Sequence, residues 1–97
     1  MTLFEGLLVL EGNVPIILDL KEHGRAYQKE LERRVGMAGQ SIKRSVDFML
    51  EQGFLQELPY DGKVPNVENW LVLTELGERV GDCLADCRKK LSAMKRG

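Results

Sequence analysis

Two short stripes of apolar residues, separated by a turn that contains glycine, constrain this chain more than any other feature. The first stripe consists of Tyr27, Leu31 and Val35, and the second of Ile42, Val46 and Met49. The spacing within each stripe is close to the 3.6 residues of a helical turn, so each segment is predicted to form a helix with one buried face. Two such helices, joined here across residues 36–38, are typical of a helix-turn-helix.

The second predicted helix has an outer face that suits contact with nucleic acid. The side chains that point away from its apolar stripe are Gln40, Ser41, Lys43, Arg44 and Asp47. This set is able to hydrogen-bond base edges and phosphates in a major groove. The sequence therefore predicts a protein that binds duplex DNA through this helix, at about 39–52.

A β-hairpin is predicted directly after the second helix. Phe54–Leu58 and Asn69–Leu73 are rich in residues that favour strands, Pro59 ends the first of them, and Asp61-Gly62 gives the connecting loop a turn signal. A hairpin in this position is a wing, which would occupy about residues 59–68.

The remaining segments are predicted to be helical. Thr2 and Glu5 fit a capping box for a helix over about 3–11. Asn13 is expected to be the N-cap of a second helix that ends before Gly24, with Val14, Ile17, Leu18 and Leu20 facing inward. A short extended piece follows at Arg25-Ala26, and Thr74 is expected to cap the last helix. We therefore predict a mainly α fold with a small β-hairpin, a winged helix-turn-helix.

A chain of 97 residues is long enough for one hydrophobic core, so a single domain is expected over 1–97. Within it we expect an N-terminal helix (1–12), a winged-helix core (13–74) and a C-terminal helix (75–97). No basic region precedes the apolar N-terminal residues, as it would in a signal peptide, and no apolar run approaches the length of a membrane span. We expect a cytoplasmic protein that does not enter a membrane.

The C-terminal helix carries a heptad seam, formed by Val80, Leu84, Cys87, Leu91 and Met94. A narrow seam of this kind faces another helix, either the N-terminal helix of the same chain or the same helix of a second copy. We expect a homodimer whose interface includes these residues together with Leu3, Phe4 and Leu7 of the N-terminal helix. Cys83 and Cys87, four residues apart and without a neighbouring metal ligand, are interpreted as buried thiols.

The charge of the chain is unevenly distributed. The formal net charge is only −1, but residues 21–44, which include the predicted helix-turn-helix, carry +4, and residues 45–87 carry −7. The positive segment therefore coincides with the predicted DNA-binding motif, where attraction to phosphates is needed.

Several local motifs resemble those of known winged-helix regulators. The signature shared by the MarR, ArsR and PadR families is similar to Gly36-Met37-Ala38, Ser41-Ile42, Arg44, Val46, Met49 and Gly53-Phe54-Leu55. The wing is most similar to that of the HxlR family, on the evidence of Tyr60, Val64-Pro65, Val67-Glu68 and the helix start Leu73-Thr74-Glu75-Leu76-Gly77. The resemblance covers about residues 12–91.

The resemblance implies a transcriptional regulator and a role for particular residues. The helix at 39–52 would be the recognition helix, with Gln40, Ser41, Lys43 and Arg44 at positions that face bases and phosphates. Lys63 at the wing tip would approach the minor groove, and Arg25, Lys29 and Arg33 would contact the DNA backbone. Asp47 should repel phosphate, so the C-terminal half of the helix is expected to leave the groove.

Other functional classes are less well supported by the sequence. A winged helix can instead serve as a protein-interaction module, and the acidic stretch 45–87 mildly favours that alternative. An enzyme is not indicated, because the one histidine, His23, lies at a predicted helix end where a cation complements the helix dipole. The serines have no base nearby in a catalytic motif, and no phosphate loop or metal-ligand cluster exists, so we expect no cofactor and no metal.

Overall fold

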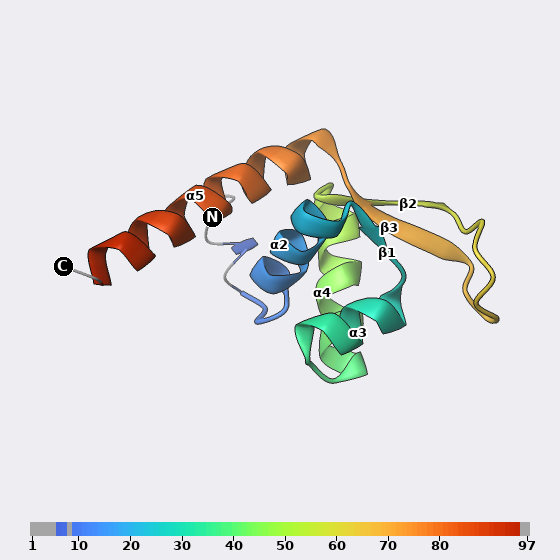
Figure 1. Ribbon diagram of the computed structural model, residues 1–97. Coiled ribbons are helices and arrows are strands. Elements are labelled where there is room, and N and C mark those ends of the chain that lie inside the picture. The colour runs from blue at the N-terminus through green and yellow to red at the C-terminus, as the bar shows by residue number, and fades with distance from the viewer. Residues whose placement is uncertain (1–5, 8, 96–97) are drawn as a thin grey trace.

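The computed structural model describes residues 6, 7 and 9–95, with side chains as far as Lys90. The elements of this part of the chain are α2 (Asn13–His23), β1 (Arg25–Ala26), α3 (Gln28–Val35), α4 (Gly39–Gln52), β2 (Leu55–Pro59), β3 (Asn69–Leu73) and α5 (Glu75–Lys95). Helices α2, α3 and α4 pack together, the β2–β3 hairpin projects from them, and α5 crosses α2 and runs away from the hairpin (Figure 1). The winged-helix fold predicted from the sequence is confirmed.

The helix-turn-helix forms as its apolar stripes predict. Leu31 on α3 and Ile42, Val46 and Met49 on α4 are buried against one another, because the spacing of each stripe brings these side chains to one face of its helix. Gly36 ends α3 in the left-handed conformation (φ 78°), where a residue with a Cβ would be strained. The turn therefore fixes the angle at which α4 leaves α3.

The sheet has three strands in the order β1-β3-β2, all antiparallel. The predicted hairpin pairs Leu55 with Leu73 and Pro59 with Asn69. The extended piece at Arg25-Ala26 joins it as a third strand on β3, which ties the start of α3 to the base of the wing. Pro59 is the last residue of β2, so the strand ends there as predicted, and proline is tolerated at this position because β2 is an edge strand.

The core corrects the expected orientation of α2. Ile16, Ile17 and Leu20 are buried, whereas Val14 and Leu18, which were predicted to face inward, are only half-buried. Apolar residues occupy more than half of the circumference of this helix, so their pattern alone does not select the inner face.

The chain before α2 also differs from its prediction. Of the expected helix over 3–11, Gly6 and Leu7 are helical, residues 9–12 form a bend and a turn, and residues 1–5 and 8 lie outside the described part of the chain. Gly12, not Asn13, is the N-cap of α2. The reason is that the Asn13 side chain is turned into the interior, where it is fully buried, instead of back towards its own backbone.

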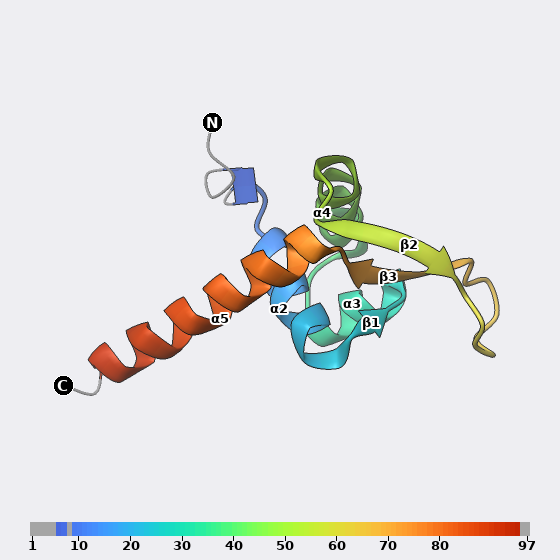
Figure 2. The same ribbon diagram turned by 90° about the horizontal axis from the view of Figure 1, so that it is seen from above.

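Helix α5 begins at a capped end and packs on α2 (Figure 2). The Thr74 hydroxyl accepts a hydrogen bond from Gly77 N at 3.1 Å, which confirms the predicted cap. Lys21 of α2 binds Glu78 at 2.6 Å and Asp82 at 2.8 Å on α5. No helix in the described ranges has both the length and the apolar character that crossing a bilayer requires.

The two cysteines of α5 are exposed, and the prediction of buried thiols is therefore wrong for the single chain. The side of α5 that packs on the core is formed by Leu76, Val80 and Leu84. Cys83 and Cys87 do not belong to this stripe.

Two glycines of α5 should respond oppositely to the same substitution. An added methyl group at Gly77 would clash with the Phe54 carbonyl oxygen, whereas at Gly81 the nearest atoms, on Ile17 and Lys21, lie 3.4 Å away. We expect Gly77→Ala to lower the free energy of unfolding by about 1–2 kcal/mol. Gly81→Ala should raise it by up to about 1 kcal/mol, because alanine favours a helix. Urea denaturation measures both changes, and equal effects would show that the close approach at Gly77 is not a constraint.

Candidate nucleic-acid interface

Helix α4 presents the polar face that the sequence predicted. Gln40, Lys43 and Arg44 are exposed and Ser41 is half-buried, while the opposite face of the helix is held in the core. Ala38 occupies the N-cap position and has no polar side chain, so the N–H groups of the first turn receive no cap from it. The positive end of the helix dipole and these N–H groups favour an anion close to Gln40 and Ser41.

Lys43 and Arg44 lie in different electrostatic environments. Lys43 Nζ is 3.1 Å from Asp47 Oδ2, one helical turn further along α4, and both side chains are more than half exposed. No carboxylate in the described part of the chain lies within 4.0 Å of the Arg44 guanidinium. Arg44 does line a surface hollow between α4 and the turn before α2, and Glu11 lines this hollow too. Arg44 is therefore the cation of this face that is most available to an external phosphate or base.

The base of the wing is held by an aromatic cluster. The Tyr60 and Trp70 rings are 4.7 Å apart, and Tyr27 lies about 6 Å from each of them. The guanidinium of Arg25 stacks on the Trp70 ring at 4.3 Å. Arg25 was predicted to contact the DNA backbone, and the structure places it at this junction, where it links β1 to the wing.

A carboxylate completes the junction at the base of the wing. Trp70 Nε1 donates a hydrogen bond of 2.8 Å to Asp61 Oδ1, and Arg25 lies 4.0 Å from the same oxygen. The Trp70 hydrogen bond first, and then the attraction of Arg25, lower the pKa of Asp61 below its usual value. Tyr60 Oη in turn accepts a hydrogen bond from Val64 N at 3.1 Å. These contacts fix the loop that carries the exposed Lys63.

Helix α3 supplies two further exposed cations, Lys29 and Arg33. Arg34, one residue further on, points inward instead and binds Asp19 of α2 at 2.8 Å. Lys29 and Lys43 both line the pocket between α4 and the wing, whereas Arg33 does not.

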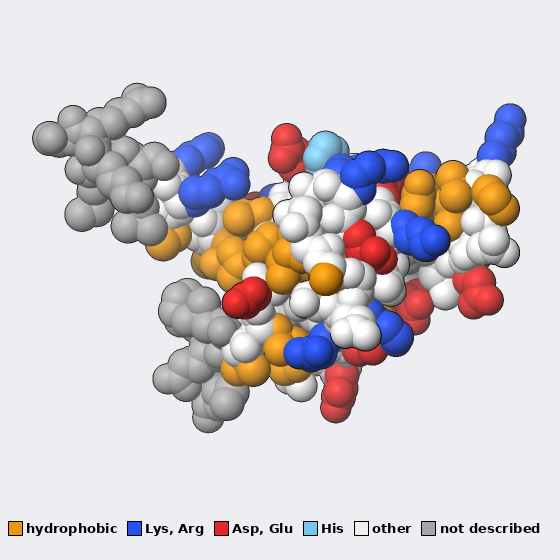
Figure 3. Space-filling model, turned by 90° about the horizontal axis from the view of Figure 1, so that it is seen from below, with side chains coloured by type: hydrophobic (Ala, Val, Ile, Leu, Met, Phe, Trp, Pro, Cys, Tyr) orange, Lys and Arg blue, Asp and Glu red, His pale blue; other side chains and the backbone are white. Residues whose placement is uncertain are grey.

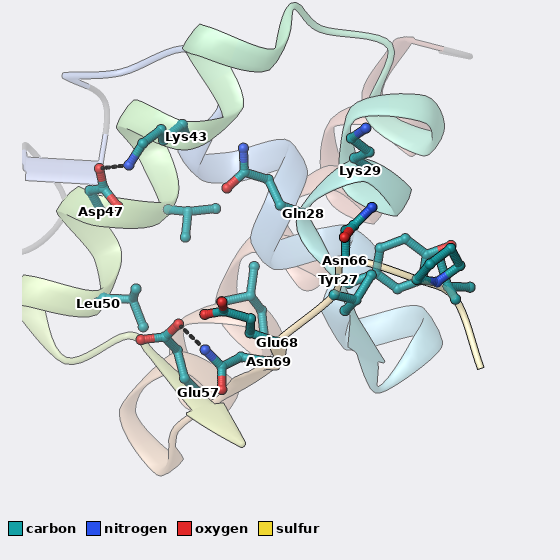
Figure 4. Close-up of a pocket in the computed structure, with 15 residues that line it drawn as sticks. Tyr27, Gln28, Lys29, Lys43, Asp47, Leu50, Glu57, Asn66, Glu68 and Asn69 are labelled. Carbon is teal, nitrogen blue, oxygen red and sulfur yellow. Dashed lines mark hydrogen bonds and ion pairs between the residues drawn. The ribbon is translucent and has the colours of Figure 1, made fainter. Parts of the chain in front are cut away.

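A groove separates α4 from the wing. Its volume is about 370 Å³, and its charged residues are Lys29, Lys43, Asp47, Glu57 and Glu68, which define what we call the helix–wing groove. Figure 4 shows the Lys43–Asp47 pair on one wall and Glu57, bound by Asn69 Nδ2 at 3.1 Å, on the other. Sequence reasoning missed Glu57 and Glu68, because only the folding of the hairpin beside α4 brings them to this place.

The surface around the candidate interface carries charges of both signs. Figure 3 shows Lys and Arg side chains interspersed with Asp and Glu, without one continuous basic area on that face. Charges of both signs on this face weaken its general attraction for polyanions. Particular contacts therefore matter more for binding to DNA.

The predicted dimer-interface residues have different positions. Leu7 is 2% exposed within this chain's own core, and Val80 and Leu84 pack partly against that core. Cys87 is exposed on α5. Leu3 and Phe4, and the side chains of Leu91 and Met94, lie outside the described residues. Among the described residues, no group of three or more His, Cys, Asp or Glu is arranged to hold a metal ion.

The fold is similar to that of several solved bacterial regulator structures. A ZitR variant from Lactococcus lactis superposes with a TM-score of 0.81 at 15% identity, covering 96% of this chain and 67% of that one. The adhesin competence repressor AdcR from Streptococcus pyogenes gives 0.75 at 15% identity, covering 96% and 68%. NMB1585, a MarR family regulator from Neisseria meningitidis, gives 0.70 at 18% identity, covering 84% and 56%. At these identities the likeness establishes the winged-helix fold.

Neither a protein-family model nor a curated protein matches the sequence. The chain spans 56% of the NMB1585 chain.

Proposed function

We propose that this chain is a sequence-specific regulator of transcription that binds duplex DNA. Helix α4 would enter the major groove, and the wing would lie along the minor groove. The observation that carries the proposal is the outer face of α4, where the described part of the chain leaves Gln40, Lys43 and Arg44 exposed on a helix whose other face is buried. A duplex held by α4 would next meet the exposed cations on α3 and on the wing.

The proposal is supported by the solved structures with this fold. One is named as a MarR family regulator and another as a repressor. Residues 1–97 would act as a single winged-helix domain, with the core over 13–74 holding the DNA-binding face. Arg25, which stacks on Trp70, would set the position of the wing, while Lys29, Arg33 and Lys63 would contact phosphates.

A binding titration tests the function with the chain alone. Fluorescence anisotropy of a labelled duplex of about 30 base pairs and random sequence should show binding at low salt that weakens steeply as salt is added, because bound cations release counterions from DNA. If no binding appears even at about 20 mM salt, where non-specific attraction should be strongest, the DNA-binding proposal fails. The winged helix would then be interpreted as a protein-interaction module.

We further propose that the protein acts as a homodimer through α5. This helix has 21 residues and extends beyond the surface of α2, and its cysteines are exposed in the single chain. A twofold dimer would cover this part of α5 and present two copies of α4 to half-sites about one helical turn apart.

Two cysteine variants test the dimer seam. Cys87→Asp should raise the dimer dissociation constant at least tenfold, because Cys87 belongs to the heptad seam and a buried, unpaired carboxylate is costly. Cys83→Asp is the matched control, since Cys83 is also exposed in the single chain but does not belong to the seam. Sedimentation equilibrium measures both constants. A monomeric wild type, or equal effects of the two substitutions, would contradict this interface.

A further inference from the structure

The helix–wing groove contains more acidic than basic side chains, which is unusual for a surface proposed to meet DNA. Asp47 comes from α4, Glu57 from β2 and Glu68 from the end of the wing loop, and all three are exposed. The basic residues of the groove are Lys29 and Lys43. Three separate segments of the chain thus bring carboxylates to one hollow (Figure 4).

The position of this groove determines what would pass through it. In duplex DNA, each phosphate backbone forms the wall between a major groove and the neighbouring minor groove. A protein that places α4 in the first and the wing in the second must therefore accommodate a DNA strand between them, in the helix–wing groove. Duplex DNA carries one negative charge per about 1.7 Å of its length, so the groove carboxylates would face phosphates.

Asp47 has a second effect, through Lys43. The 3.1 Å contact between the two side chains neutralises the one lysine that α4 contributes to the groove. Because both partners are well exposed, this ion pair is weak and Lys43 can leave it. Asp47 nevertheless competes with any phosphate for that cation.

We propose that Asp47, Glu57 and Glu68 form a charge filter, which lowers the affinity of this protein for DNA irrespective of sequence. This inference rests on the DNA-binding function proposed above. Phosphates are the same in every duplex, so their repulsion weakens binding to all of them. Base contacts from α4 then decide which duplex is bound in spite of that repulsion. The filter would keep a regulator with few free cations from being held at unrelated sites.

Substitutions that remove the charges test the filter. The probe is a fluorescent duplex of about 30 base pairs and random sequence, titrated at low and at moderate salt. Glu57→Gln combined with Glu68→Gln leaves the Lys43–Asp47 pair intact, and glutamine can still accept the hydrogen bond that Asn69 donates to residue 57. We expect binding to tighten about twofold to fivefold for each carboxylate removed at low salt, and less at moderate salt.

Asp47→Asn should show an additional change. Because it also releases Lys43, the slope of log affinity against log salt should steepen by about one unit. Adding Lys43→Gln to Asp47→Asn should abolish that increment. A change in the slope is a readout that altered folding alone would not produce.

Matched controls remove carboxylates elsewhere. Glu22→Gln, at the end of α2, accompanies the single variant, and Glu22→Gln with Glu75→Gln accompanies the double variant. Both residues are exposed and lie outside the groove. We expect these controls to bind within twofold of the wild type.

The outcomes separate the filter from the DNA-binding function. Groove variants that bind no more tightly than their controls, while the wild type binds, would overturn the filter alone. Groove variants that bind more tightly than both the wild type and the controls would support it. If none of the proteins binds the duplex, the DNA-binding function fails, and the filter fails with it.

Discussion

Replacing Ile42 with alanine is expected to lower the free energy of unfolding by about 2–5 kcal/mol. Ile42 lies on the inner face of α4 and is fully buried in the core. Alanine would remove three methyl or methylene groups and leave a cavity that the surrounding side chains fill only partly. The measurement is urea denaturation followed by circular dichroism, analysed for a single transition.

Ile42→Val provides the scale for this effect, because it removes one methylene group and should cost about 0.5–1.5 kcal/mol. A cost below about 1 kcal/mol for Ile42→Ala would mean that α4 is not held by the core. The orientation of its outer face would then be undetermined.

Replacing Arg44 with alanine should weaken DNA binding and leave the stability of the fold nearly unchanged. This side chain is exposed and has no carboxylate partner within 4.0 Å among the described residues, so the free energy of unfolding should change by less than about 0.5 kcal/mol. Affinity for a preferred duplex should fall by about 1–3 kcal/mol, measured by anisotropy at fixed salt, because an arginine contact to a base or phosphate is lost.

Two further variants define the role of Arg44. Gln52→Ala changes another exposed residue of α4, at its C-terminal end, and should leave affinity unchanged. Arg44→Lys keeps the charge but not the two-pronged guanidinium. It should retain most of the affinity if the contact is to phosphate and lose it if the contact is to guanine. An Arg44→Ala protein that binds as well as the Gln52→Ala protein would remove Arg44 from the interface.

The helix-turn-helix could be predicted because its determinants are local. The stripes that include Leu31 and Val46 follow the helical period, and the turn glycine Gly36 has the left-handed conformation that few other residues adopt. The same reasoning failed on α2, where apolar residues surround the helix and did not reveal that Ile16 is buried.

The groove carboxylates could not be predicted, because their arrangement depends on tertiary structure. Glu57 and Glu68 lie on β2 and in the wing loop, and their distance from Asp47 depends on how the hairpin folds against α4. Nothing in the local sequence distinguishes Arg25 from any other surface arginine. Its stacking on Trp70 follows from the pairing of β1 with β3, which no local pattern indicates.

The exposed cysteines show a different limit of sequence reasoning. A heptad seam indicates that α5 faces another helix, but it does not say whether that helix belongs to the same chain. Within one chain, Val80 and Leu84 reach the core and Cys87 does not. In the proposed dimer, α5 of the second copy would cover the remainder of the seam.

Selection of bound duplexes from a random pool is the measurement that tests the central claim most directly, since the claim is that the outer face of α4 reads DNA. The account predicts an enriched palindrome whose two half-sites lie about one helical turn apart, and loss of the enriched half-site bases when the Arg44→Ala protein is used for selection. A pool that remains random after repeated rounds with the wild type, under salt conditions that permit binding, would contradict the claim.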